Sequence, residues 1–172
     1  MTAITFDSAI VQRMLEDAIE SCAKKTGLKD RTQILEKMRR GDCATCEYLR
    51  YGLAKGVAEY LGSVDDTIKA IYIYEPEHAT SLDEPIPDRP SLSPGISLIA
   101  WVSRKSAALS SVVASVSSAL AQECKQFACP KANALCYQLD VQATDDDEVQ
   151  RRAGYGALIH SLYVRPTEIW SR

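Results

Sequence analysis

The sequence has few of the residues, and none of the short motifs, that identify a chemistry. Only 2 histidines occur in 172 residues. The chain contains no phosphate-loop motif, no His-Glu-x-x-His pair and no Gly-x-Ser-x-Gly turn. The net charge is −3, from 20 basic and 23 acidic residues, which provides no strong positive field for nucleic-acid phosphates. We therefore expect that nucleic acid is not the partner.

Long hydrophobic runs are also missing. The first residues contain neither the basic nor the apolar segment of a secretory signal. The longest uncharged run, residues 106–122, includes six serines and is too polar to span a bilayer. We therefore expect a cytoplasmic protein without a membrane partner. In that reducing compartment, the 6 cysteines would be buried thiols, metal ligands or redox groups rather than disulfides.

The composition is that of one globular domain. Apolar residues make up 46% of the chain and charged residues 25%, and a length of 172 residues is ordinary for a single domain. We expect one domain over residues 1–172, with a helical front at 6–62 and a strand-bearing back at 64–172. Residues 75–95 hold five prolines and fit no regular element, which predicts a mobile loop.

Apolar residues recur at helical spacing in three segments of the front. The pattern predicts helices at 7–26, 30–40 and 42–61, each followed by a glycine. Gly52 and Gly56 lie inside the third helix, where each costs about 1 kcal/mol of helix stability relative to alanine. Their presence on one face predicts a neighbour packed close to the backbone: the sheet, the helix that covers it, or a second subunit in a homodimer.

The back alternates strands with helices. Apolar and β-branched runs predict strands at 68–74, 96–102, 135–141 and 158–164, and helical spacing predicts a long helix at 103–127. A strand, a helix and a strand in succession predict a parallel pair joined by a crossover. The expected fold class is α+β: an N-terminal three-helix segment packed with a mixed sheet of about four strands and one long crossover helix.

The pair Cys43 and Cys46 is the sharpest local feature. Both thiols lie near the start of the third helix, on one face, where the helix dipole favours a thiolate. The spacing suits a dithiol redox pair or half of a zinc site, which Cys124 and Cys129 would complete. The spacing of the second pair is loose, and Cys124 falls on the apolar face of its helix. Two partly buried cysteines at a helix start are the simpler interpretation.

A glycine-containing turn with two arginines is a second candidate. Gly154 and Gly156 could form a backbone nest for a phosphate, with Arg151 and Arg152 beside it. This turn is the candidate site for a phosphorylated or nucleotide ligand. An ordinary helix end that leads into a strand explains the same residues more simply.

The remaining polar residues have structural explanations. Acidic residues 145–147 fill the first turn of a short helix that Thr144 caps, where they complement the helix dipole without a cation. Neither His78 nor His160 has a partner at metal-ligand spacing. The tyrosines at helical and strand spacing are expected mostly in the core and at its rim: Tyr48, Tyr51, Tyr60, Tyr72 and Tyr74.

Three hypotheses about function follow. The first is a non-catalytic interaction or ligand-binding protein, dimeric through the glycine-bearing helix. The second is a zinc- or thiol-dependent protein that uses Cys43 and Cys46. The third is an enzyme that binds a phosphorylated or nucleotide ligand between Arg151 and Gly156. Because the third helix carries both the glycines and the thiols, the seam between front and back is the first place to search for a site.

Overall fold

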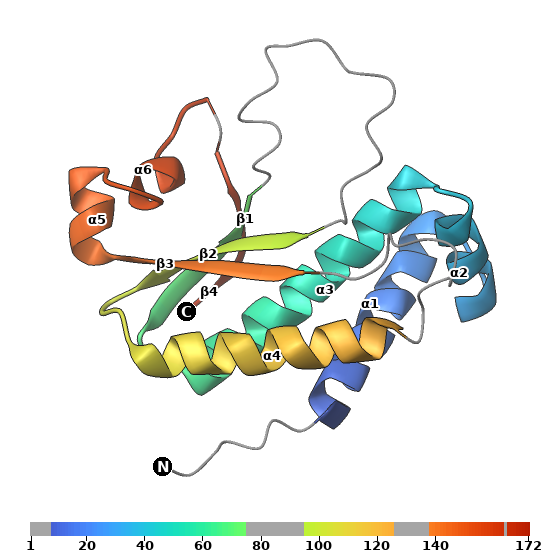
Figure 1. The fold of residues 1–172 in the computed structure, drawn as a ribbon. Helices are drawn as coiled ribbons and strands as arrows, with labels where there is room; N and C mark the ends of the chain where they lie inside the picture. The colour runs from blue at the N-terminus through green and yellow to red at the C-terminus, as the bar shows by residue number, and fades with distance from the viewer. Residues whose placement is uncertain (1–7, 75–94, 126–137, 164) are drawn as a thin grey trace.

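The computed structural model of the chain describes residues 8–74, 95–125, 138–163 and 165–172 (Figure 1). The helices are α1 (Ser8–Thr26), α2 (Arg31–Arg39), α3 (Cys43–Val64), α4 (Ala107–Lys125), α5 (Asp146–Arg151) and α6 (Gly156–Ile159). The strands are β1 (Ile68–Ile73), β2 (Ile96–Val102), β3 (Leu139–Asp145) and β4 (Thr167–Ser171).

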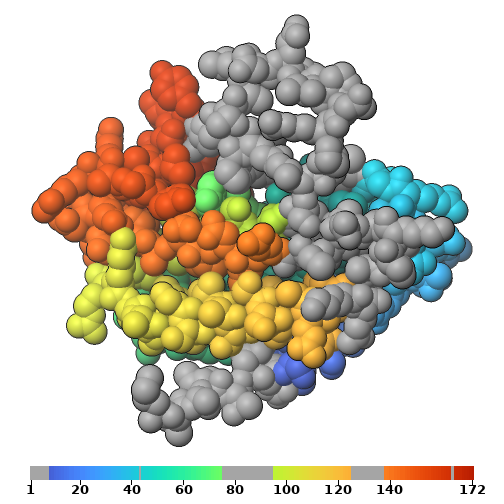
Figure 2. All heavy atoms as spheres, in the orientation of Figure 1, coloured from blue at the N-terminus to red at the C-terminus, as the bar shows by residue number. Residues whose placement is uncertain are grey.

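The four strands form one mixed sheet in the order β3-β2-β1-β4. Strand β1 pairs antiparallel with both β2 and β4, whereas β2 and β3 are parallel and joined through α4. Helices α3 and α4 pack against one face of the sheet, and α1 packs against both helices (Figure 1). Figure 2 shows α4 and β3 side by side on the surface. The predictions of an α+β fold and a parallel crossover are confirmed.

Alternation along β2 shows how the two sheet faces differ. Leu98 and Val102 join the large core under the helices, with Ile96 and Ala100. Ile99 points to the opposite face, because successive strand side chains alternate, and it packs with Val149 and Ile159. The helical front and the strands therefore share one large core, and a smaller cluster lies on the other side of the sheet.

The close neighbour predicted from the glycines of α3 is α1. A Cβ atom at Gly52 would lie 3.0 Å from the Cα atom of Ala18, and one at Gly56 would lie 3.3 Å from the Cβ atom of Met14. The prediction of close backbone approach is confirmed, but the neighbour is α1 rather than the sheet or the helix α4 that covers it, so that part of the prediction is wrong. Since α1 of the same chain covers this face, the glycines give no argument for a homodimer, which stays a prediction.

The predicted strand at 158–164 is wrong. Gly156–Ile159 forms α6, while Leu162 and Tyr163 are 94% and 97% exposed. The edge of β1 is taken instead by Thr167–Ser171, which begins directly after the buried Pro166. Proline lacks the N–H that a paired strand needs, so pairing starts beyond it.

Several element boundaries also differ from the prediction. Helix α4 begins at Ala107 rather than at residue 103. Helix α3 continues through Gly62 to Val64, and the Trp170 ring packs where a Cβ atom of Gly62 would stand. Strand β3 begins at Leu139, and residues 135–137 lie outside the described part of the chain. Asp145, rather than Thr144, caps α5, since its carboxylate accepts from the Glu148 amide at 3.0 Å. The predicted loop at 75–95 lies outside the described residues except for Gly95.

Candidate functional site

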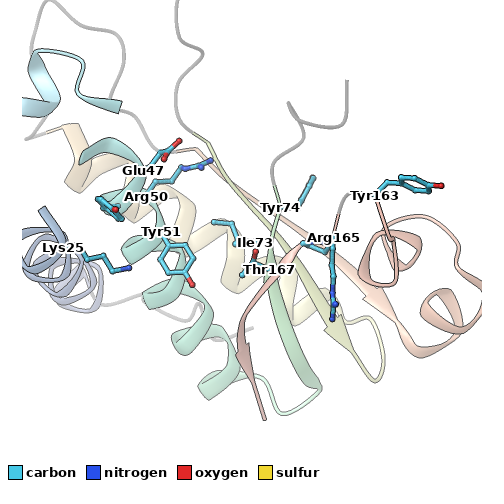
Figure 3. Close-up of a pocket in the computed structure, with 11 residues that line it drawn as sticks. Lys25, Glu47, Arg50, Tyr51, Ile73, Tyr74, Tyr163, Arg165 and Thr167 are labelled. Carbon is cyan, nitrogen blue, oxygen red and sulfur yellow. The ribbon is translucent and has the colours of Figure 1, made fainter. Parts of the chain in front are cut away.

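A cavity of about 580 Å³ lies at the seam between the helical front and one end of the sheet (Figure 3). We call it the seam cavity. One wall comes from the last turn of α1 and the first turns of α3, and the other comes from the end of β1 and the start of β4. The described lining residues are Lys25, Glu47, Tyr48, Arg50, Tyr51, Ile73, Tyr74, Tyr163, Arg165, Pro166 and Thr167.

The helical wall combines two tyrosine rings with an ammonium group. Tyr48 and Tyr51 are three residues apart on α3, so their rings lie on the same face of the helix. The Nζ atom of Lys25 on α1 lies 5.4 Å from the centroid of the Tyr48 ring and 5.2 Å from that of Tyr51. Both distances are within the range of cation–π attraction. This wall is therefore aromatic and positively charged at once.

The sheet wall presents a tyrosine that stays neutral. The ring of Tyr74 packs edge-on against Tyr155, with 5.9 Å between centroids and 60° between the planes. Burial first, and then the hydrogen bond with Tyr155, raise the pKa of Tyr74 far above its ordinary value of 10.0. The phenol is therefore an uncharged hydrogen-bonding group at neutral pH.

Arg165 and Tyr163 lie on the far side of the cavity from Lys25, and Figure 3 shows the Tyr163 ring pointing outward. Arg165 also influences Tyr72 on β1. Burial and the neighbouring Glu168 raise the pKa of Tyr72, and the positive charge of Arg165 opposes that increase. The guanidinium therefore lies near the phenol and carboxylate groups of β1 and β4.

The charge of the seam cavity is opposite in sign to that of the whole chain. Its described lining holds three cationic side chains, Lys25, Arg50 and Arg165, and one carboxylate, Glu47, whereas the net charge of the chain is −3. A local positive excess in a concave site raises the concentration of anions there. The seam cavity is therefore suited to an anionic ligand with an apolar or aromatic part.

The cysteines lie outside the described lining of the seam cavity. Cys46 is half-buried against the core, and the buried Cys22 donates its Sγ–H to the carbonyl oxygen of Thr45 at 3.6 Å. Burial raises the pKa of the Cys22 thiol, so this thiol stays protonated. The described residues contain no group of three or more His, Cys, Asp or Glu side chains that could hold a metal. The side chain of Cys43, and Cys129 entirely, lie outside the description.

The buried Cys124 lies away from Cys46. Gln12 Nε2 donates to Glu123 Oε2 at 3.5 Å, which places the end of α4 beside the first half of α1. Cys46 lies at the other end of α1, beside Cys22 and Thr45. Ten residues of α-helix span about 15 Å, more than one metal ion can bridge. The arrangement gives the four-cysteine zinc site no support, and that site stays a prediction.

The turn after α5 has the features of a helix end. Arg151 Nε pairs with Asp147 Oδ1 at 3.0 Å, and Arg152 ends the helix in the left-handed conformation. Gly154 is exposed, whereas Gly156 is buried so close to α5 that a Cβ atom would stand 2.6 Å from the backbone of Glu148. The chain then enters α6 rather than a strand. These contacts explain the turn without a phosphate, and the phosphate site there stays a prediction.

The other described polar residues considered as candidates either make internal hydrogen bonds or lie at the surface outside the lining of the seam cavity. Asp146 accepts from Lys69 Nζ at 2.6 Å and from Trp101 Nε1 at 2.8 Å, so its carboxylate serves internal contacts. Asp145 caps α5. His160 is exposed after α6, and His78 lies outside the described residues.

The sequence patterns direct the search to the seam but do not indicate the charged residues that line the cavity there. They predict Tyr48 and Tyr51 in the core and at its rim, and they give no role to Lys25. The available signal was the short interval on α3 in which two tyrosines and Arg50 occur within four residues. Nothing in that interval indicates that Arg165 lines the same cavity, because more than a hundred residues separate them.

Within the described part of the chain, every helix is too short or too polar to cross a bilayer. Comparison with known proteins found no protein-family model, no curated protein and no solved structure that matches this chain. The seam cavity is therefore the feature of this chain from which a function can be proposed.

Proposed function

We propose that the chain is a non-catalytic binding protein of the cytoplasm that holds a small anionic ligand in the seam cavity. The observation that carries the proposal is the described lining, which holds the cations Lys25, Arg50 and Arg165, one carboxylate (Glu47) and four tyrosines. The volume of about 580 Å³ falls within the roughly 300–1,000 Å³ of typical small-molecule sites.

The chemistry of the lining favours binding over catalysis. Its described residues include neither histidine nor cysteine, the two side chains most often used as general base or thiol nucleophile. The groups present instead supply charge, ring faces and hydrogen bonds. Tyrosine and arginine are also enriched among the residues that contribute most to binding at protein interfaces.

Isothermal titration with inorganic phosphate, glycerol 3-phosphate and citrate, each compared with neutral glycerol, tests the proposal. We expect at least one anion to bind, with an affinity that falls as salt concentration rises. Because hydrogen bonds to charged groups are worth about 1.5–3 kcal/mol, Lys25→Ala and Arg165→Ala should each weaken binding about tenfold or more.

Lys24→Ala is the matched control. Lys24 neighbours Lys25 on α1, but its Nζ atom pairs with Glu20 at 2.7 Å and both side chains are largely exposed. This variant should bind as the unmodified protein does. Equal binding of glycerol and the anions, or equal losses in Lys24→Ala and Lys25→Ala, would contradict the proposal.

The zinc or thiol function at Cys43 and Cys46 is a separate proposal. Its support is the position of both residues in the first turn of α3, which Asp42 caps by accepting from the Thr45 amide at 2.8 Å. Elemental analysis of the purified protein should then find about one zinc per chain, lost in Cys43→Ser. A metal-free protein with unreactive thiols would contradict the zinc or thiol function.

A further inference from the structure

The helical wall of the seam cavity places ring faces and a positive charge side by side. Tyr48 is 40% exposed, so part of its ring is open to a ligand. The ammonium of Lys25 already lies over this ring and over that of Tyr51, at 5.4 and 5.2 Å. A ring face that attracts a cation is also a surface on which a planar base can stack.

Lys25 is available to an anion. Among the described residues, its contacts are the two tyrosine rings, and no carboxylate pairs with it. The side chain is exposed and has a flexible stem, so the ammonium can move from the ring faces to a phosphate while staying on the same wall. That movement would free the rings at the moment the anion is bound.

From this juxtaposition we infer that the ligand is a nucleoside monophosphate, with its base stacked on Tyr48 and its phosphate held by Lys25. The inference rests on the proposed function and names the ligand class for the same site. A nucleoside monophosphate joins a planar ring to a dianion through one sugar, and the cavity volume of about 580 Å³ accommodates a ligand of that size.

Titration of the full chain with adenosine and uridine monophosphates, ribose 5-phosphate and adenosine tests the inference. We expect the nucleotides to bind at least about tenfold more tightly than ribose 5-phosphate, since stacking of a base on an aromatic ring contributes that much. Adenosine should bind more weakly than its monophosphate, because it has no group for Lys25.

Variants of Tyr48 measure how much its ring contributes to nucleotide affinity. Tyr48→Phe keeps the ring and should keep nucleotide affinity, whereas Tyr48→Ala should lose about tenfold for the nucleotides and nothing for ribose 5-phosphate. Leu162→Ala is the control, since Leu162 is 94% exposed and is not among the residues that line the cavity. Thermal melting of each variant checks that the fold is retained.

The outcomes separate the two proposals. If ribose 5-phosphate binds as tightly as the nucleotides, or if Tyr48→Ala weakens both equally, the inference is wrong while anion binding stands. If no phosphate compound binds but citrate does, the inference is again wrong and the proposed function stands. If neither the phosphates nor citrate binds, both are wrong.

Discussion

The helical face of the sheet and the opposite face differ in what covers them. On the helical face, α1, α3 and α4 enclose a large core with side chains from the strands, many of them without solvent exposure. On the opposite face, the buried cluster consists of Ile99, Val149 and Ile159, bordered by tyrosine and tryptophan rings. The second face has fewer apolar contacts and more polar ones.

Ion pairs help to hold the second face together. Lys69 Nζ lies 2.6 Å from Asp146 Oδ2, and Lys105 Nζ lies 2.6 Å from Glu148 Oε1, with all four side chains substantially exposed. Exposed pairs of this kind contribute little each, so α5 and α6 should open more easily than the helical core. The seam cavity lies where the helical front meets the end of β1 and the start of β4.

The largest expected effect on stability comes from shortening one of two adjacent residues of β2. Leu98 and Ile99 are both fully buried but point to opposite faces. We expect Leu98→Ala to cost about 4 kcal/mol of unfolding free energy and Ile99→Ala about 2 kcal/mol, because the smaller cluster can collapse onto a cavity more completely. Urea unfolding monitored by circular dichroism measures both. Equal losses would show that the two faces are equally well packed.

The next effect concerns the contact of α1 with α3. A Cβ atom at Gly52 would press on the backbone of Ala18 at 3.0 Å, whereas one at Gly56 would meet the Met14 side chain at 3.3 Å. Because a side chain can move and a backbone cannot, Gly52→Ala should destabilise by about 1–2 kcal/mol. Gly56→Ala should be neutral or stabilising, since alanine favours the helix by about 1 kcal/mol. Thermal melting that ranks the two variants in reverse would contradict this geometry.

The smallest effect is a pH dependence on the opposite face. Hydrogen bonds from Lys69, then from Trp101, hold the pKa of Asp146 below its ordinary value of 3.8. The unfolded chain therefore takes up this proton first as pH falls, so the stabilisation is complete well above pH 3.8 and is lost as pH falls through the lower folded pKa. Asp146→Asn should be slightly less stable than the unmodified protein at pH 7, and the difference should disappear in acid.

Denaturant midpoints of Asp146→Asn and the unmodified protein, recorded from pH 7 down to pH 2.5, provide the measurement. Ser103→Ala, at an exposed position after β2, serves as a control whose difference from the unmodified protein should not change with pH. A gap between the Asp146 variant and the unmodified protein that stays constant over this range would contradict the pairing with Lys69.

Local sequence signals were sufficient to predict those helix ends that are stabilised by residues close to them in the sequence. The start of α3 followed from Asp42, whose carboxylate accepts from an amide of the first turn, and the end of α1 followed from Gly27, which has a φ of 70°. The apolar run of β2 and the helix that follows it predicted a parallel pair with the next strand. The two helix ends depend on residues within a few positions of one another, and the parallel pair follows from the order of consecutive elements.

Tertiary structure decided what depends on distant partners. The run at 158–164 has the composition of a strand, but Thr167–Ser171 pairs with β1, because strand formation requires an open edge and a free row of amides. Gly62 resembles a helix stop and is instead where Trp170 packs on α3. The candidate site is of the same kind: Lys25, Tyr48 and Arg165 are far apart in sequence and line one cavity only because α1, α3 and β4 pack around the same end of the sheet.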